Sequence, residues 1–219
     1  MDRVSRLEPE VADSIAHAAI QLSRSEPQQT HLGVLHREKS QLKLLHLPWH
    51  NRLQNELAED ASAVAIELDL PALRLAQVAG ISRLVWRENE NGGVPYAFSA
   101  PVSAFGEAGD FQPREGLIGL TCATFVMAVF SRAGLDLIDA TDWPEREEDT
   151  EWQERMLQLL AQFGASEEHT SAVRGEVGSA RYRPEEVAAA GAAETTPARF
   201  DVLNELVPRV LAILDEQPE

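Results

Sequence analysis

Two neighbouring segments of alternating residues constrain the fold of this chain more than any other feature. The segments "THLGVLHR" (30–37) and "QLKLLHLPW" (41–49) have the period of two that is typical of strands, and the polar turn "EKS" separates them. Two strands joined by so short a turn pair in an antiparallel hairpin. Helical patterns follow, so the sequence predicts an α+β fold in which a small antiparallel sheet packs on a helix.

The segments around this hairpin divide the chain into three parts. Before it, apolar residues at helical spacing in residues 9–23 predict a short amphipathic helix. We therefore expect an N-terminal helix (1–27), an α+β core (28–139) and a helical extension (140–219) packed on the core. Within the last two parts we expect a strand at 62–70, a helix from about Pro71 to Glu88, an extended segment "VPYAFSAPV", a helix from Cys122 to about Gly134, and helices in "DWPEREEDTEWQERMLQLLAQFG", "RYRPEEVAAAGA" and "ARFDVLNELVPRVLAIL", the last interrupted or kinked at Pro208.

Composition excludes several classes of function. The chain has 219 residues and a formal charge of −17, from 36 acidic and 19 basic residues, which disfavours nucleic acid as a partner. Its apolar runs are shorter than the ~20 residues of a membrane span, and no signal peptide is evident, so we expect a cytoplasmic protein. One cysteine excludes an internal disulfide and a multi-cysteine zinc site. The sequence predicts no cofactor and no particular oligomeric state.

That single cysteine, Cys122, lies at the N-terminal end of a predicted helix. The apolar residues after it recur at helical spacing, so the helix packs on a core and Cys122 lies where core meets solvent. Free N–H groups and the positive helix end favour a thiolate there, and they would also stabilise an oxyanion. Thr121 is the expected N-cap. The alternative is that Cys122 is an inert buried residue.

Strand alternation brings two histidines of the hairpin together. A two-residue loop at 38–39 would place His31 opposite His46, and a four-residue loop would place His31 opposite Pro48 with His46 one step away on the same face. A three-residue loop would separate the two histidines. With an even loop they face the cysteine helix together and His36 lies outside. Cys122 would then be the nucleophile, His31 its base and His46 the residue that orients His31.

These segments resemble a known superfamily. "HLGVLHR…LKLLHL" resembles the histidine strand pair of the NlpC-type papain-like cysteine hydrolases, in which a His–hydrophobic–Gly–hydrophobic strand carries the base and the next strand a polar third residue. "TCATFVMAVF" resembles their nucleophile helix. The histidine precedes the cysteine here, as in the circularly permuted branch that includes lecithin:retinol acyltransferase-like and bacterial YiiX-like proteins. The resemblance covers residues 28–135 and implies a Cys122–His31–His46 catalytic triad. Thr121 and Ala123 stand where many relatives have Asp or Asn and Ser.

Several alternatives stay open at this point. His31, His46 and His50 would bind zinc if His50 continued the strand, although Pro48 is expected to end it. His36 and His50 are otherwise expected at the surface. Trp49 and Tyr96, with Phe98, are candidates for lining a substrate cleft, and the alternative is that they are plain core. Arg181 and Arg183 are expected to pair with nearby acids and are left out of the site.

The sequence thus predicts a cysteine hydrolase or acyltransferase that acts on an amide or thioester bond. Its partner would be a small peptide, amide or acyl substrate. The alternative is a catalytically silent binding or accessory protein on the same scaffold.

Overall fold

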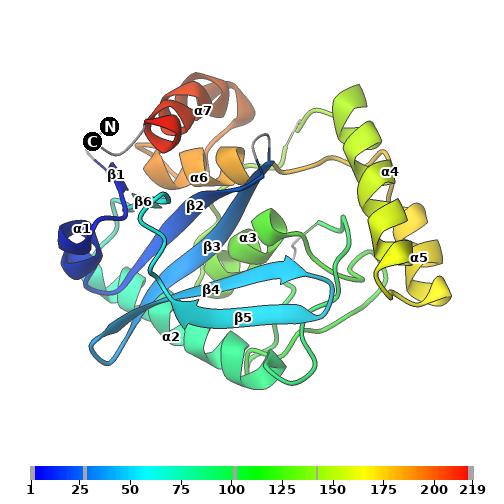
Figure 1. The fold of residues 1–219 in the computed structure, drawn as a ribbon, viewed down its shortest axis with the longest axis horizontal. Coiled ribbons are helices and arrows are strands. Elements are labelled where there is room, and N and C mark those ends of the chain that lie inside the picture. Colours follow the sequence, from blue (N-terminus) through cyan, green and yellow to red (C-terminus); the bar gives the residue numbers. More distant parts are fainter. Residues whose placement is uncertain (1–2, 27–28, 101–102, 142, 217–219) are drawn as a thin grey trace.

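The computed structural model describes residues 3–26, 29–100, 103–141 and 143–216 and has the predicted α+β architecture. Its strands form one antiparallel sheet with the order β1-β6-β2-β3-β4-β5 (Figure 1). The strands are β1 (Val4–Arg6), β2 (Ala18–Glu26), β3 (Gln29–Glu38), β4 (Gln41–Trp49), β5 (Arg52–Leu57) and β6 (Val64–Ile66). The helices are α1 (Pro9–Ser14), α2 (Ala72–Asn89), α3 (Cys122–Arg132), α4 (Glu147–Gln162), α5 (Glu167–Arg174), α6 (Pro184–Ala192) and α7 (Phe200–Asp215).

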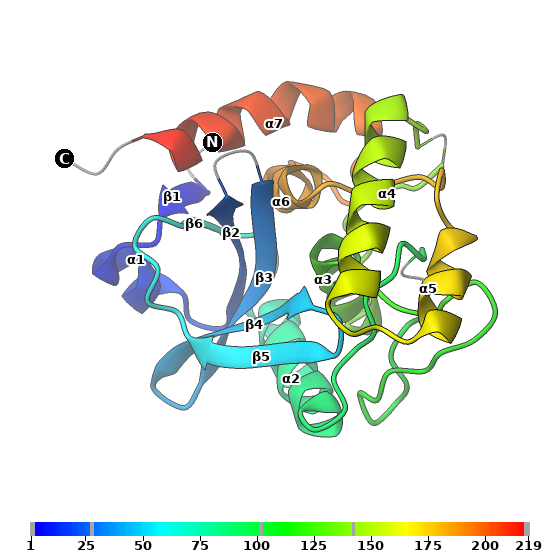
Figure 2. The ribbon, with the colours of Figure 1, turned by 45° about the vertical axis from the view of Figure 1, so that its right-hand side comes forward.

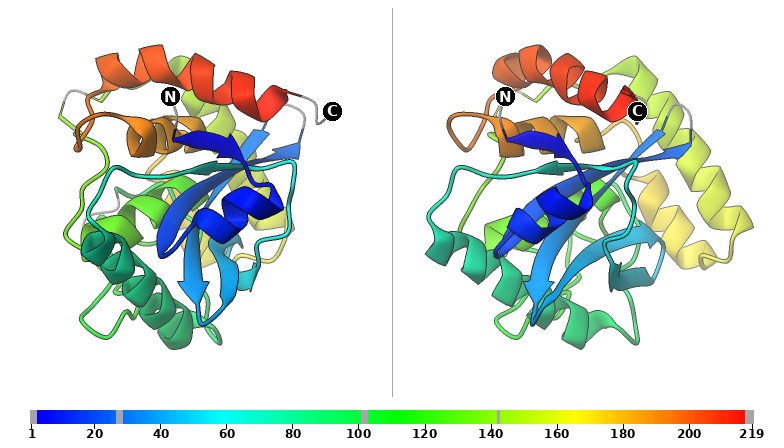
Figure 3. Two further views of the ribbon diagram at one scale, coloured as in Figure 1. Left: turned by 90° about the vertical axis from the view of Figure 1, so that its left-hand side faces the viewer. Right: turned by 60° about the vertical axis from the view of Figure 1, so that its left-hand side comes forward.

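Helices cover the two faces of the sheet unequally. Helices α2, α3 and α6 pack on one face and build the main core, whereas α1 packs with Leu35 and Leu44 on the other face. Helix α7 lies along α6, and α4 and α5 stand at one side of the molecule (Figures 2 and 3). Within the C-terminal part of the chain, α6 packs against β2, β3 and α3, and α7 packs against α6 and β1. No helix in the described residues is long and apolar enough to cross a membrane.

The predicted N-terminal helix at 9–23 is wrong over most of its length. Only Pro9–Ser14 are helical, and Ala18–Glu26 form β2, which pairs with β3 and β6 in the middle of the sheet. Ile20 and Leu22 face the main core and Ala19 faces the second core under α1. The helical interpretation arose because Ala18, Ala19 and Leu22 also fit the apolar spacing of a helix. The expected boundary at residue 27 thus falls between two paired strands.

The other predicted elements differ less from the structure. Strand β6 lies within the expected strand at 62–70, and α2, α3, α4, α6 and α7 lie where helices were expected. Helix α7 continues through Pro208 and is not interrupted there. Residues 94–100 belong to no helix or strand, and 101–102 lie outside the described residues. Strand β5 and helix α5 were not predicted.

Helix α3 is the buried centre of the molecule. Every residue from Cys122 to Phe130 is buried, so the helix is enclosed on all sides and does not bury one stripe alone. Thr121 is the N-cap, as predicted: its Oγ1 accepts a hydrogen bond from the Thr124 N–H (3.2 Å), and the Thr121 N–H donates to Thr124 Oγ1 (2.8 Å). After the helix ends, Gly134 has φ +72°, which glycine tolerates. This cap fixes the position of Cys122, the first helical residue.

Candidate active site

The turn of the β3–β4 hairpin sets which histidines lie together. Its loop has two residues, 39–40, and the register pairs Gly33 with His46. In this register Pro48 is the residue across from His31, and His46 comes two residues earlier in β4 on the same face. His31 and His46 therefore share a face of the sheet, as predicted for an even loop.

The two imidazoles contact each other directly. His31 Nε2 lies 2.8 Å from His46 Nδ1, and the rings meet edge to face. The hairpin is tightly packed at Gly33, opposite His46, because a Cβ on Gly33 would lie 2.4 Å from Leu44 Cδ1 and 3.0 Å from the Cβ of His46. A side chain at position 33 would therefore press on Leu44 and on the residue that carries the second imidazole.

A carboxylate extends the pair toward the edge of the sheet. Glu56 on β5 places Oε1 3.4 Å from His46 Nε2, close enough for an ion pair but outside hydrogen-bond geometry. In the tautomer that this carboxylate favours, His46 carries its proton on Nε2 and its Nδ1 accepts from the His31 Nε2–H. The lone pair of His31 Nδ1 is then free to act as a base. Sequence reasoning missed Glu56 because it missed β5.

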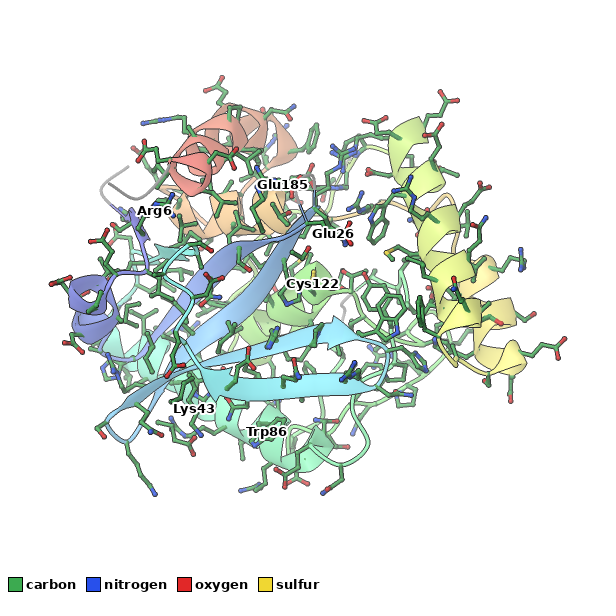
Figure 4. All side chains as sticks on the ribbon, viewed as in Figure 1. Arg6, Glu26, Lys43, Trp86, Cys122 and Glu185 are labelled. Carbon is green, nitrogen blue, oxygen red and sulfur yellow. The ribbon has the colours of Figure 1, made fainter. Side chains whose placement is uncertain are left out.

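Cys122 and His31 line the same cavity. The cavity is narrow, about 50 Å³, and opens where β3 and β4 diverge beyond the last pair of their ladder, Gly33 and His46. Figure 4 shows Cys122 at the end of α3 between these diverging strands. Among the other lining residues are Trp49, Tyr96, Thr121, Trp152, Met156, Arg181 and Tyr182.

The histidine pair lies on the face of the sheet opposite helix α3. Leu32 and Val34 pack in the main core with α3, so alternation puts His31 and His46 on the opposite face. The expectation that both histidines face the cysteine helix directly is therefore wrong: His31 reaches the cavity and His46 stands behind it. In the described part of the chain no hydrogen bond joins Cys122 to His31.

Burial sets the resting protonation of the site. It raises the pKa of Cys122 to about 11, although N–H groups of Leu32 and Ala123 and the charge of Arg181 act in the other direction. Burial, with the neighbouring His46, lowers the pKa of His31 to about 4, and burial lowers that of His46 to about 4. The resting pair is thus a neutral thiol and a neutral imidazole. The thiolate expected from the helix end does not prevail because desolvation is the larger effect.

The remaining histidines of the hairpin lie outside this pair. His36 was expected at the surface but is fully buried, with Nε2 2.8 Å from Asn55 Oδ1. His50 lies in the β4–β5 turn, where Nδ1 accepts a hydrogen bond from the Tyr96 N–H and its ring contacts His169. No three His, Cys, Asp or Glu side chains in the described ranges are grouped to hold a metal, so the zinc alternative has no support here.

The predicted aromatic residues divide between the cavity and the packing around it. Trp49 and Tyr96 both line the cavity, and their ring centroids are 5.4 Å apart. Tyr96 lies close enough to Cys122 for their charges to interact, and burial raises its pKa well above the usual range. Phe98 packs against Trp152 of α4 and does not line the cavity.

Arg181 belongs to the cavity, although sequence reasoning left it out. Its guanidinium carbon lies 3.6 Å from the centre of the Trp152 ring, and Nη1 donates to Asp149 (3.1 Å). The pairing with a nearby acid was expected, but the burial beside Cys122 was not. The available signal was an arginine pair in "ARYRPEE" within an acidic chain.

No family model, curated protein or solved structure is detectably similar to this chain. The resemblance to the permuted papain-like branch rests on the short motifs around His31 and Cys122. The function must be argued from the geometry of the site.

Proposed function

We propose that the protein is a cysteine hydrolase or acyltransferase that attacks an amide or thioester carbonyl through Cys122. The observation that carries the proposal is the placement of a capped helix-terminal thiol and an oriented histidine pair around one cavity. A helix cap, a steric glycine and an adjacent carboxylate all support this arrangement. Residues that only fill a hydrophobic core do not require a cap, a glycine and a carboxylate to orient them.

The reaction starts from the neutral pair. His31 Nδ1 takes the proton of the Cys122 thiol as sulfur attacks the carbonyl carbon, and the resulting imidazolium donates its proton to the leaving amine or thiol. The acyl group then remains on sulfur as a thioester. Water in a hydrolase, or another nucleophile in an acyltransferase, attacks this thioester with His31 again as base, and the thiol is regenerated. His46 and Glu56 hold the His31 tautomer throughout.

Two donors are available to the oxyanion that forms on attack. The backbone N–H of Cys122 belongs to the first turn of α3, where N–H groups lack helical partners. The phenol of Tyr96 lines the same cavity and has no hydrogen-bond partner among the described residues. We assign Trp49 to the wall that holds the acyl chain.

Trapping of an acyl-enzyme tests the proposal. Small activated esters and thioesters are added to the wild-type protein, and the mass of the peptide containing Cys122 is measured. We expect acylation at Cys122 that falls strongly in His31→Ala. If no ester or thioester acylates Cys122, and His31→Ala leaves thiol reactivity unchanged, the proposal is wrong.

A catalytically silent binding protein is the second candidate. The high pKa of Cys122 and the lack of a direct bond to His31 favour it. Its biological effect would survive Cys122→Ala, whereas an enzyme would lose it. For both candidate functions we propose a cytoplasmic location, where a single thiol stays reduced.

A further inference from the structure

The cavity beside Cys122 has an unusual charge for this protein. The chain carries a formal charge of −17, yet none of the described residues that line the cavity is acidic. Arg181 is the one permanently charged side chain in that lining. The nearest acids lie behind the wall, where Glu185 accepts from Thr30 and Asp149 from Arg181, so the cavity surface itself presents a cation and no carboxylate.

The guanidinium of Arg181 is held in place, but only some of its hydrogen-bond donors have partners among the described residues. Its side chain is 15% exposed and its guanidinium stacks on Trp152, which sets the plane of the group. One hydrogen bond leaves it, from Nη1 to Asp149. In the described part of the chain Nε and Nη2 have no partner, so this edge of the guanidinium has donors to spare.

The acid that holds Arg181 is shared with other arginines. Asp149 is 2% exposed and also accepts from Arg146 Nε (2.5 Å) and Arg183 Nε (2.9 Å). Arg146 and Arg183 each have a further acidic partner, Glu186 and Glu148. Asp149 therefore anchors a cluster of three arginines, of which only Arg181 reaches the cavity.

We infer that Arg181 is an anion subsite, which selects acyl groups that carry a carboxylate a few bonds from the reacting carbonyl. The inference rests on the proposed function and names its substrate class. A carboxylate matches the fork of a guanidinium and is bound by two parallel hydrogen bonds. The narrowness of the cavity favours a small acyl group, such as one half of a short dicarboxylic acid.

A pair of alkylating reagents tests the subsite without knowledge of the substrate. Iodoacetate and iodoacetamide transfer groups of similar size to the same thiolate, and only iodoacetate carries a carboxylate. The ratio of their rates at Cys122 therefore cancels the fraction of thiolate. The ratio is measured by mass spectrometry in wild type, Arg181→Gln and Arg183→Gln. Arg183→Gln is the matched control, because it removes an equal charge from the same cluster outside the cavity.

We expect Arg181→Gln to lower the iodoacetate-to-iodoacetamide ratio about tenfold, as for a lost hydrogen-bonded ion pair. Arg183→Gln should keep the wild-type ratio to within about twofold. Equal ratios in wild type and Arg181→Gln overturn the inference, and so does an equal fall in both variants, which would indicate only the general field of the protein.

A measurement on the wild type covers the case in which Arg181→Gln does not fold. Succinate should protect Cys122 from iodoacetamide, and its neutral analogue succinamide should not. Equal protection by the two, or none by either, overturns the subsite. The failures are distinct: a protein that shows the carboxylate preference but forms no acyl-enzyme has the subsite and lacks the proposed activity. A thiol that neither reagent reaches until the protein unfolds refutes both.

Discussion

Acid should destabilise this protein through its histidine pair. His31 and His46 have pKa values of about 4 in the folded protein against a usual 6.5, because burial disfavours the charged imidazole. In the unfolded chain both histidines bind protons near pH 6.5, whereas in the folded protein they bind them only near pH 4. The stability from the neutral pair is therefore complete above pH 6.5 and is lost as the pH falls toward 4.

The size of the effect follows from these two values. Between pH 7 and pH 5, each histidine lowers the free energy of unfolding by about 2 kcal/mol, and the two together by about 4 kcal/mol if they titrate independently. His36 adds to the fall, because burial lowers its pKa as well. A loss of this size is a large part of the stability of a typical domain.

Urea unfolding at pH 7, 6 and 5, followed by tryptophan fluorescence and circular dichroism, measures this loss. In His46→Gln the fall from pH 7 to pH 5 should shrink by about 2 kcal/mol. Lys39→Gln, on the same hairpin, removes no histidine and is the matched control. A wild-type fall below about 0.5 kcal/mol, or an undiminished fall in His46→Gln, would refute the reasoning about the buried pair.

Three further substitutions test other parts of the site. Gly33→Ala should destabilise the protein by about 1–3 kcal/mol in urea unfolding, because the new Cβ collides with Leu44 and His46; unchanged stability would contradict this steric role. Glu56→Gln should change stability by less than about 1 kcal/mol, since Glu56 is 56% exposed. The imidazole ¹⁵N spectrum of Glu56→Gln should show mixed histidine tautomers where the wild type shows one. Identical spectra would show that Glu56 does not set the tautomer of the histidine pair. Asp149→Asn should cost about 3–5 kcal/mol in urea unfolding, because three arginines lose their shared buried anion; a loss below about 1 kcal/mol would show that the anion is dispensable.

The histidine hairpin was predictable because its information is local. Alternation in β3 and β4 fixes which residues share a face, and the short turn leaves few registers. The choice between registers could not be made from the sequence, yet both even registers bring His31 and His46 together. The N-cap of α3 was predictable for the same reason, since Thr121 is adjacent to the helix it begins.

The parts that were missed depend on contacts far apart in the chain. Strand β2 looked helical because Ala18, Ala19 and Leu22 fit a helical spacing, whereas its burial depends on a core that includes residues after 180. Arg181 lies in the cavity because α4 and the segment before α6 dock beside the sheet, and no local pattern indicates that docking. The protonation of Cys122 was misjudged for a similar reason: the helix end is visible in the sequence, whereas the depth of burial is not.

The walls of the cavity also set an order of events during synthesis. They come from the hairpin, from Tyr96, from residues 121–123, from α4 and from the segment 181–184, so the last wall leaves the ribosome about sixty residues after the cysteine. Until then the cavity lacks Arg181 and Tyr182. The surroundings of the thiol are therefore complete only after the segment that carries Arg181 has been made and has docked. Any truncation before residue 181 would remove Arg181 and Tyr182 from the wall beside the cysteine.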